Sequence, residues 1–321
     1  MTGTSAVLAP WQRRVYERAV ATYAAGTLGH AMLLCGPALL GKRAVADALA
    51  RHILDADTPG RAAHLIDAGT HPDFHVIGLV MNKEGTRLRT EIVIDQMREL
   101  STKLTLTPQY RGAQIAIVDP ADAINHAACN ALLKTLEEPR LGRYLWLLSA
   151  DPARLPATIR SRCQRLEFRL PPREEALTWL QSQGHAMKAA SDALDAARDH
   201  PGLADAWLRD GGIALRRDVA SDLAKLRSGE LAVIDTAQRW TRDDDAPLRL
   251  RHAADLALAE AGGLTDTMRM RKLSMWFDAA NRTRDLLRTT VRADLAVAEL
   301  LLAWRGNEEP VSASSGVRTR S

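Results

Sequence analysis

The first half of the chain alternates short, continuously apolar segments with longer amphipathic segments, and this alternation restricts the fold more than any other feature. The apolar segments predict five strands, at residues 30–36, 73–80, 113–119, 144–150 and 163–168. Continuous apolar strands separated by helices are typical of a parallel sheet that is covered on both faces. We therefore expect an α/β domain at residues 1–168.

The second half has a different pattern, because from residue 176 to residue 305 amphipathic helical segments are interrupted only by glycine and proline. We expect a small helical domain at residues 169–210 and a larger all-α domain at residues 211–306. The last segment, residues 307–321, lacks periodicity and is rich in small polar residues, which predicts a disordered tail.

Composition excludes several classes of protein. The three cysteines, Cys35, Cys129 and Cys163, are far apart and form no Cys-x-x-Cys pair, so neither a disulfide framework nor a thiolate zinc site is indicated. No secretion-type signal opens the sequence, and no apolar run reaches the roughly 18 residues of a membrane span. We expect a cytoplasmic protein. A net charge of +4 permits contact with nucleic acid without establishing it.

A phosphate-binding loop is nearly complete between the first strand and the next helix. The pattern Gly-x-x-x-x-Gly-Lys is present at Gly36, Gly41 and Lys42, and its setting between a strand and a helix is the one that such loops require. The pattern continues with serine or threonine, whose hydroxyl binds magnesium, but here the next residue is Arg43. Two hypotheses follow: weak nucleotide binding, or a tight turn that has no ligand.

The second part of an ATPase site is an acidic pair after a strand, one residue for magnesium and one that orients water. Asp119 follows the third apolar segment, but Pro120 occupies the position of the second acid. With that carboxylate and the hydroxyl both missing, the sequence predicts that the chain does not hydrolyse ATP. The alternative is an active ATPase in which Lys42 and Asp119 suffice and Arg43 is tolerated.

Two longer motifs carry a resemblance to a known family. "NALLKTLEEP" at residues 130–139 and "LPATIRSRC" at residues 155–163 resemble the clamp-loader branch of the AAA+ ATPases, and within it the family of bacterial delta-prime subunits. "AGTHPDF" at residues 68–74 is also similar. The resemblance implies an AAA+ α/β domain, a helical lid, and a C-terminal collar that packs against the collars of other subunits.

The resemblance also implies a function. Ser161, Arg162 and Cys163 match a motif in which the arginine acts as a finger in the nucleotide site of a neighbouring subunit, worth on the order of 10³–10⁵ in rate. The implied chain is a non-hydrolysing stator, not an enzyme on its own. Its partners would be the delta and tau/gamma ATPase subunits, with the sliding clamp and primed DNA reached through the DNA polymerase III assembly. The alternatives are a motor ATPase subunit and, for Arg162, an ordinary surface arginine.

The sequence departs from the family at the residues that sense the nucleotide and at the zinc module. Ala204 replaces an arginine that senses the γ-phosphate, and Ser149 is the candidate for a second sensing residue. The family's four-cysteine zinc module is missing, and we expect His64, His71 and His75 to be surface residues of a loop, so no zinc is predicted. Several basic residues could face DNA, namely Arg87, Arg89, Arg111, Lys134, Arg140 and Arg143.

Overall fold

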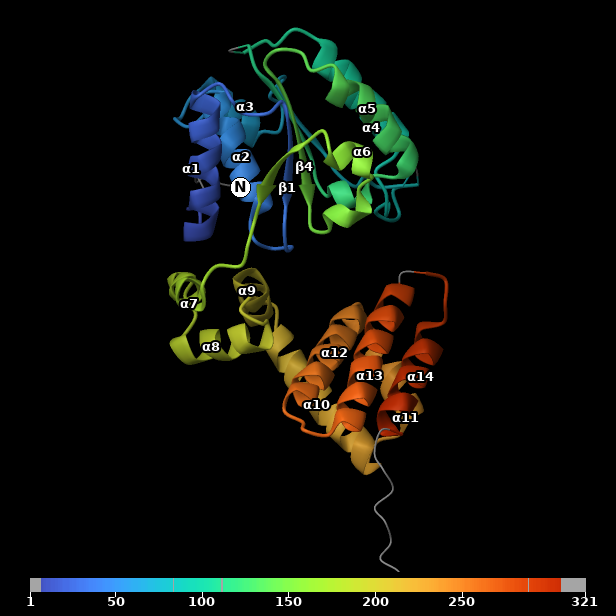
Figure 1. Ribbon diagram of the computed structural model, residues 1–321. Coiled ribbons are helices and arrows are strands. Elements are labelled where there is room, and N and C mark those ends of the chain that lie inside the picture. The colour runs from blue at the N-terminus through green and yellow to red at the C-terminus, as the bar shows by residue number, and fades with distance from the viewer. Residues whose placement is uncertain (1–6, 83, 111, 288, 307–321) are drawn as a thin grey trace, which may run out of the picture. The chain divides into compact units, whose positions relative to one another are not determined.

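The computed structural model describes residues 7–82, 84–110, 112–287 and 289–306. The chain divides into two compact units between Asp205 and Ala206 (Figure 1). Most of the expected lid, residues 169–210, therefore belongs to the same unit as the α/β domain. The division into three domains stays a prediction, and the expected disordered tail at residues 307–321 lies outside the described residues.

A parallel sheet of five strands forms the centre of the first unit, in the order β2-β3-β4-β1-β5. The strands are β1 (Ala31–Cys35), β2 (Phe74–Ile77), β3 (Gln114–Val118), β4 (Arg143–Ser149) and β5 (Gln164–Glu167). Each strand overlaps the apolar segment that predicts it, and the expected α/β class is confirmed. Because all strands are parallel, their carboxyl ends lie at one edge of the sheet and their amino ends at the other.

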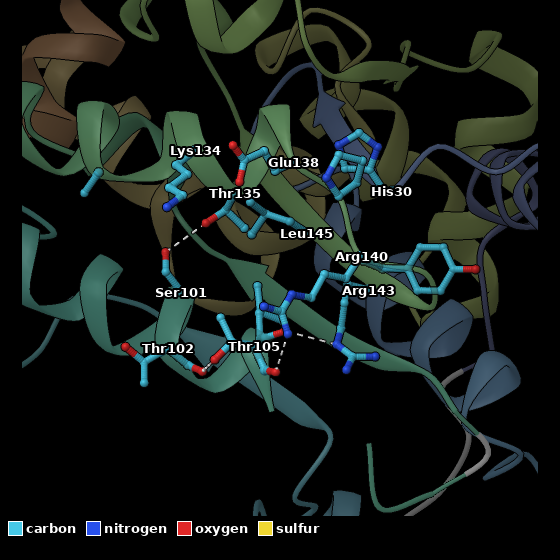
Figure 2. Close-up of a pocket in the computed structure, with 14 residues that line it drawn as sticks. His30, Ser101, Thr102, Thr105, Lys134, Thr135, Glu138, Arg140, Arg143 and Leu145 are labelled. Carbon is cyan, nitrogen blue, oxygen red and sulfur yellow. Dashed lines mark hydrogen bonds between the residues drawn. The ribbon is translucent and has the colours of Figure 1, made fainter. Parts of the chain in front are cut away.

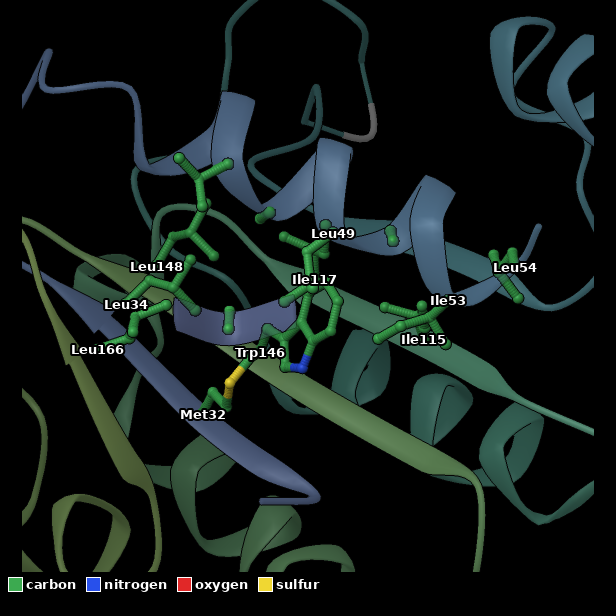
Figure 3. Packing of buried hydrophobic residues seen from close by; sticks show 14 of the residues in the cluster. Met32, Leu34, Leu49, Ile53, Leu54, Ile115, Ile117, Trp146, Leu148 and Leu166 are labelled. Carbon is green, nitrogen blue, oxygen red and sulfur yellow. The ribbon is translucent and has the colours of Figure 1, made fainter. Parts of the chain in front are cut away.

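Helices cover both faces of this sheet because alternate residues of each strand point to opposite sides. In β1, Met32 and Leu34 join one buried cluster, whereas Leu33 joins the other. The first cluster (Figure 3) is covered by α1 (Pro10–Ala24), α2 (Lys42–Ile53) and α3 (Arg61–Asp67). The second is covered by α4 (Ile94–Thr105), α5 (His126–Glu137) and α6 (Ala157–Arg160). Short 3-10 turns, η1 (Ala121–Ala123) and η2 (Pro152–Arg154), follow β3 and β4.

Three further helices follow β5, namely α7 (Arg173–Ser182), α8 (Met187–Ala196) and α9 (Pro201–Arg209). Helix α7 is held to α1 by two contacts. Arg14 donates to the Glu175 carboxylate through both terminal nitrogens, at 2.7 and 2.9 Å, and the rings of Trp11 and Trp179 meet edge to face with centroids 5.1 Å apart. The N-terminal helix therefore links the sheet to the helices that follow it.

The second unit is a helical bundle. Its helices are α10 (Gly212–Ser228), α11 (Val233–Trp240), α12 (Ala246–Gly262), α13 (Thr267–Leu286) and α14 (Ala293–Arg305). Tryptophans anchor its core, and three of the buried indoles donate a hydrogen bond: Trp240 to Asp222, Trp276 to the carbonyl of Leu300, and Trp304 to that of Leu223. The all-α character expected of this half of the chain is confirmed.

One expectation about surface residues is wrong. His64 is exposed, but it lies on helix α3 and not on a loop. His71 is buried: its ring packs 4.8 Å from that of Tyr110, and its Nδ1 accepts a hydrogen bond from the Asp73 amide. His75 lies in β2. The sequence did not predict the burial of His71, because the segment around it has no clear periodicity of apolar residues.

A buried histidine gives the second unit a pH-dependent stability. His252 of α12 is fully buried, with its ring 4.6 Å from that of Trp207. Burial lowers its pKa to about 4, and the nearby positive charges of Arg216 and Arg251 add to the effect. Between pH 6.5 and 4 the unfolded chain binds a proton at this residue and the folded chain does not. Acid therefore favours unfolding in this range.

We predict that His252→Gln makes unfolding less dependent on pH. Between pH 6.5 and 4 the wild-type chain should lose on the order of 3 kcal/mol more stability than the variant, because only the wild type carries the buried imidazole. Urea unfolding at a series of pH values measures this difference. Parallel stability curves for the two proteins would contradict the prediction.

Candidate functional site

The phosphate-loop segment leaves the carboxyl end of β1 and enters α2 at Gly41, which has a left-handed backbone (φ 84°). Gly36 has φ 135°, and a Cβ there would lie 2.2 Å from the carbonyl oxygen of Phe168. A Cβ on Gly41 would lie 2.1 Å from the side chain of Gln12. Gly36 is therefore required by close packing against the backbone as well as by its conformation, whereas Gly41 is required by its left-handed conformation, because the flexible side chain of Gln12 can move.

Lys42 points back onto its own loop. Its ammonium donates to the carbonyl oxygens of Gly36 at 2.7 Å and Pro37 at 2.8 Å, and the residue is 9% exposed. Burial lowers the pKa of this lysine, and the charges of Asp122 and Asp119 oppose that shift. In this arrangement the positive charge that would meet a phosphate is held by backbone oxygens of the loop.

Arg43 occupies the position at which a metal-binding hydroxyl is expected. Its Nε donates to the Asp47 carboxylate at 2.8 Å, and its Nη1 lies 3.7 Å from Oδ2 of Asp119. Burial raises the pKa of Asp119, and the charges of Arg43 and Lys42 oppose this rise. A guanidinium carries only N–H donors and cannot bind a cation.

These residues do not fit a magnesium ion. The position after Lys42 supplies no oxygen, and Asp119 is paired with the guanidinium of Arg43. Among the described residues, no group of three or more His, Cys, Asp or Glu side chains is placed to hold a metal ion. Where a metal would sit in an ATPase, this chain has an internal ion pair.

The candidate sensing residue also has an internal partner. Ser149, at the end of β4, is fully buried, and its hydroxyl donates to the carboxylate of Asp122. The same carboxylate accepts from the Ala150 amide at 2.7 Å. Asp122 therefore fixes the turn after β4, a role that its sequence position does not indicate. Ala204 is fully buried.

The outer side of the loop is in contact with two helices. The carbonyl of Leu40 accepts from the indole of Trp11 at 3.1 Å and from the amide of Gln12 at 3.2 Å. At Gly202, the second residue of α9, a Cβ would lie 2.0 Å from the carbonyl oxygen of Leu39. The loop is thus packed against α1 and against the start of α9, and no sequence pattern indicated either contact.

The second candidate site is the segment that precedes β5. Ile159 and Cys163 are buried, which fixes the backbone on both sides of Arg162, and the Arg162 side chain is 37% exposed. Its Nη2 lies 2.6 Å from Oε1 of Glu137, and its Nη1 donates to the carbonyl of Thr158 at 3.0 Å. The Ser161 hydroxyl donates to the same carbonyl.

The thiol of Cys163 is a structural group. Burial raises its pKa to about 11, so it stays protonated and unreactive at neutral pH. The contact between Arg162 and Glu137 was missed by sequence reasoning. The two residues lie in separate motifs, and no feature of either motif shows that they meet.

The sheet register separates the two candidate sites. Met32 of β1 pairs with Gln164 of β5, so Arg162 lies beside the residues that precede β1. The phosphate loop begins at the other end of β1. His30 and Gly36 are six residues apart, which corresponds to a distance of roughly 20 Å along a strand at 3.3 Å per residue. Arg162 and the phosphate loop of the same chain therefore lie at opposite edges of the sheet.

Some of the basic residues have structural contacts. Arg140 donates to the carbonyl of Thr105 at 2.8 Å, and Arg143 donates to the carbonyls of Leu104 and Leu106, so both satisfy backbone groups at the end of α4. Together with Lys134 they line a cavity of about 370 Å³ between α4 and α5 (Figure 2). Arg87 is exposed, and Arg111 lies outside the described residues. That these residues face DNA stays a prediction.

Comparison with known proteins identifies the family. A family model described as "DNA polymerase III, delta subunit" matches residues 11–172, half of the chain. This chain belongs to the DNA polymerase III delta-subunit family. The matched segment contains the phosphate-loop residues and the Ser161–Cys163 motif. Both candidate sites therefore lie in the part of the chain that matches the family model. The resemblance to the delta-prime subunits of clamp loaders is confirmed.

Curated relatives in this family carry the name DNA polymerase III subunit delta′. The one from Escherichia coli (strain K12) is 37% identical over 196 residues, which cover 59% of this chain and 56% of the relative. The one from Haemophilus influenzae is 33% identical over 218 residues, covering 66% and 64%. The chain therefore spans between half and two thirds of the length of these two relatives.

A solved structure supports the fold. A DNA polymerase III gamma subunit-related protein from Thermotoga maritima has a TM-score of 0.52 at 18% identity, with 92% of this chain and 99% of that chain covered. At this identity the match shows the fold alone. None of the described helices combines the length and the apolarity that crossing a bilayer requires.

We predict that Gly36→Ala destabilises this family member by roughly 3 kcal/mol or more, because the new Cβ would collide with a backbone oxygen in a conformation that suits glycine alone. The matched control is Gly69→Ala, which also has a positive φ (68°) but no atom within 4 Å of the new Cβ. This control should lose only about 1 kcal/mol. Denaturant unfolding measures both variants, and equal losses would show that the contact with Phe168 is unimportant.

Proposed function

We propose that this chain is the non-hydrolysing delta-prime subunit, or stator, of a bacterial clamp loader, and that it works in the cytoplasm within a DNA polymerase III assembly. Its partners are a delta subunit and tau/gamma ATPase subunits, which together place a sliding clamp on primed DNA. The names of the relatives and the family match support this assignment. The chain contributes one arginine to ATP hydrolysis at a neighbouring subunit.

The observation that carries the non-hydrolysing assignment is the ion pair of Arg43 with Asp119. Hydrolysis in phosphate-loop ATPases depends on magnesium held by a hydroxyl and a carboxylate. In this chain the hydroxyl is replaced by a guanidinium that neutralises the carboxylate, and Pro120 replaces the residue that would orient water. We expect at most weak binding of ATP or ADP at the loop, no resident metal and no zinc.

The position of Arg162 supports the finger assignment. Its guanidinium is partly exposed, and it lies at the edge of the sheet opposite the phosphate loop of its own chain. It can therefore reach a nucleotide only on another subunit. A guanidinium directed at γ-phosphate oxygens stabilises the charge that develops there in the transition state.

We predict that the purified chain does not hydrolyse ATP. Steady-state turnover should equal that of Lys42→Ala, the control that removes the loop ammonium, because neither protein can position magnesium. Turnover that exceeds this control and disappears with Lys42→Ala would assign the chain to the motor ATPase subunits instead.

We predict that Arg162→Ala lowers ATP turnover in the reconstituted complex by roughly 10³-fold or more at sites next to this chain, since fingers in trans contribute about 10³–10⁵. The fold should be unaffected because the side chain is partly exposed. Arg165→Ala, an exposed arginine in β5, is the matched control and should leave turnover unchanged. Full turnover with Arg162→Ala would refute the finger.

A further inference from the structure

The strongest observation outside the family motifs is the partner of Arg162. Glu137 is the last residue of α5, and its Oε1 lies 2.6 Å from Nη2 of Arg162. The backbones of both residues are fixed, because Leu136 and Cys163 beside them are buried. An arginine side chain rotates about several bonds and would otherwise be poorly ordered at the surface.

The geometry leaves the guanidinium able to bind a further acceptor beyond the two that it already contacts. One terminal nitrogen contacts Glu137 and the other donates to the carbonyl of Thr158. A guanidinium has five N–H donors, so these two contacts do not exhaust it. Glu137 can therefore stay bonded to Arg162 while the other N–H groups of the guanidinium donate to an anion.

Stability alone does not account for this contact. The side chains of Arg162 and Glu137 are 37% and 49% exposed, and ion pairs with this degree of exposure contribute little to folding. Orientation of a functional group by a hydrogen-bonded neighbour is, in contrast, a recurrent requirement of precise sites.

We propose that Glu137 is a positioning residue for Arg162, one that orients the guanidinium toward the phosphate oxygens of a nucleotide held by the neighbouring subunit. This inference rests on the proposed function. Glu137 acts through Arg162 and does not touch the nucleotide. The next residue, Glu138, has a different surrounding: it lines the cavity between α4 and α5, where Figure 2 shows it with Lys134 and Thr135.

The test uses the reconstituted complex with six versions of this chain: wild type, Glu137→Ala, Glu137→Gln, Arg162→Ala, the double variant Glu137→Ala with Arg162→Ala, and Glu138→Ala as the matched control. Glu137→Ala should lower kcat for ATP by about 10- to 100-fold, as misplacement of a catalytic group does, with little change in KM. Glu137→Gln should recover part of the loss because its amide oxygen still accepts a hydrogen bond. Glu138→Ala should match the wild type.

The double variant decides between positioning and a structural role. If Glu137 acts through Arg162, Glu137→Ala has no further effect once Arg162 is alanine. Equal losses in both backgrounds, an equal loss with Glu138→Ala, or unchanged or increased turnover with Glu137→Ala would each overturn the inference. A loss with Arg162→Ala but none with Glu137→Ala would overturn this inference alone. No loss with Arg162→Ala would overturn the proposed function itself.

Discussion

The placement of every candidate site depends on the parallel pairing of β1 with β4 and β5. This register puts the loop after β1 at the carboxyl edge of the sheet, and the segment before β5 at the amino edge. Parallel sheets of this kind usually carry ligands at the carboxyl edge. Here that edge is filled by contacts within the chain, whereas the amino edge presents a partly exposed guanidinium. The same pairing therefore places the phosphate loop and the guanidinium of Arg162 at opposite edges of the sheet.

Three polar side chains in and beside the loop have partners within the chain. Lys42 is held by loop carbonyls, Arg43 by two carboxylates, and Ser149 by Asp122. Each of these three side chains therefore has a partner inside the protein. Buried polar groups are costly when they are unpaired, so these partners within the chain stabilise the loop and the end of β4.

The sequence predicted the parts of this arrangement that depend on local pattern. The five strands follow from continuous apolar runs, and the replacements at Arg43 and Pro120 are visible by position alone. The contacts of Arg43 with Asp119 and of Arg162 with Glu137 were not predicted, because each joins residues that are distant in sequence and meet only through the sheet register. The burial of His71 was missed for a similar reason, since Tyr110 reaches it from another segment.

The packing of α9 against the loop has a mechanical consequence. In a motor protein a bound nucleotide can change the angle between sheet and lid because it contacts both. In this chain the junction is made by protein contacts, namely Gly202 on Leu39, Trp11 on Trp179 and Arg14 on Glu175. A ligand shifts an equilibrium only by the difference in its affinity for the two states. A junction that is closed by contacts within the chain gives a nucleotide little to distinguish, so the angle between the sheet and these helices is set by the protein's own packing.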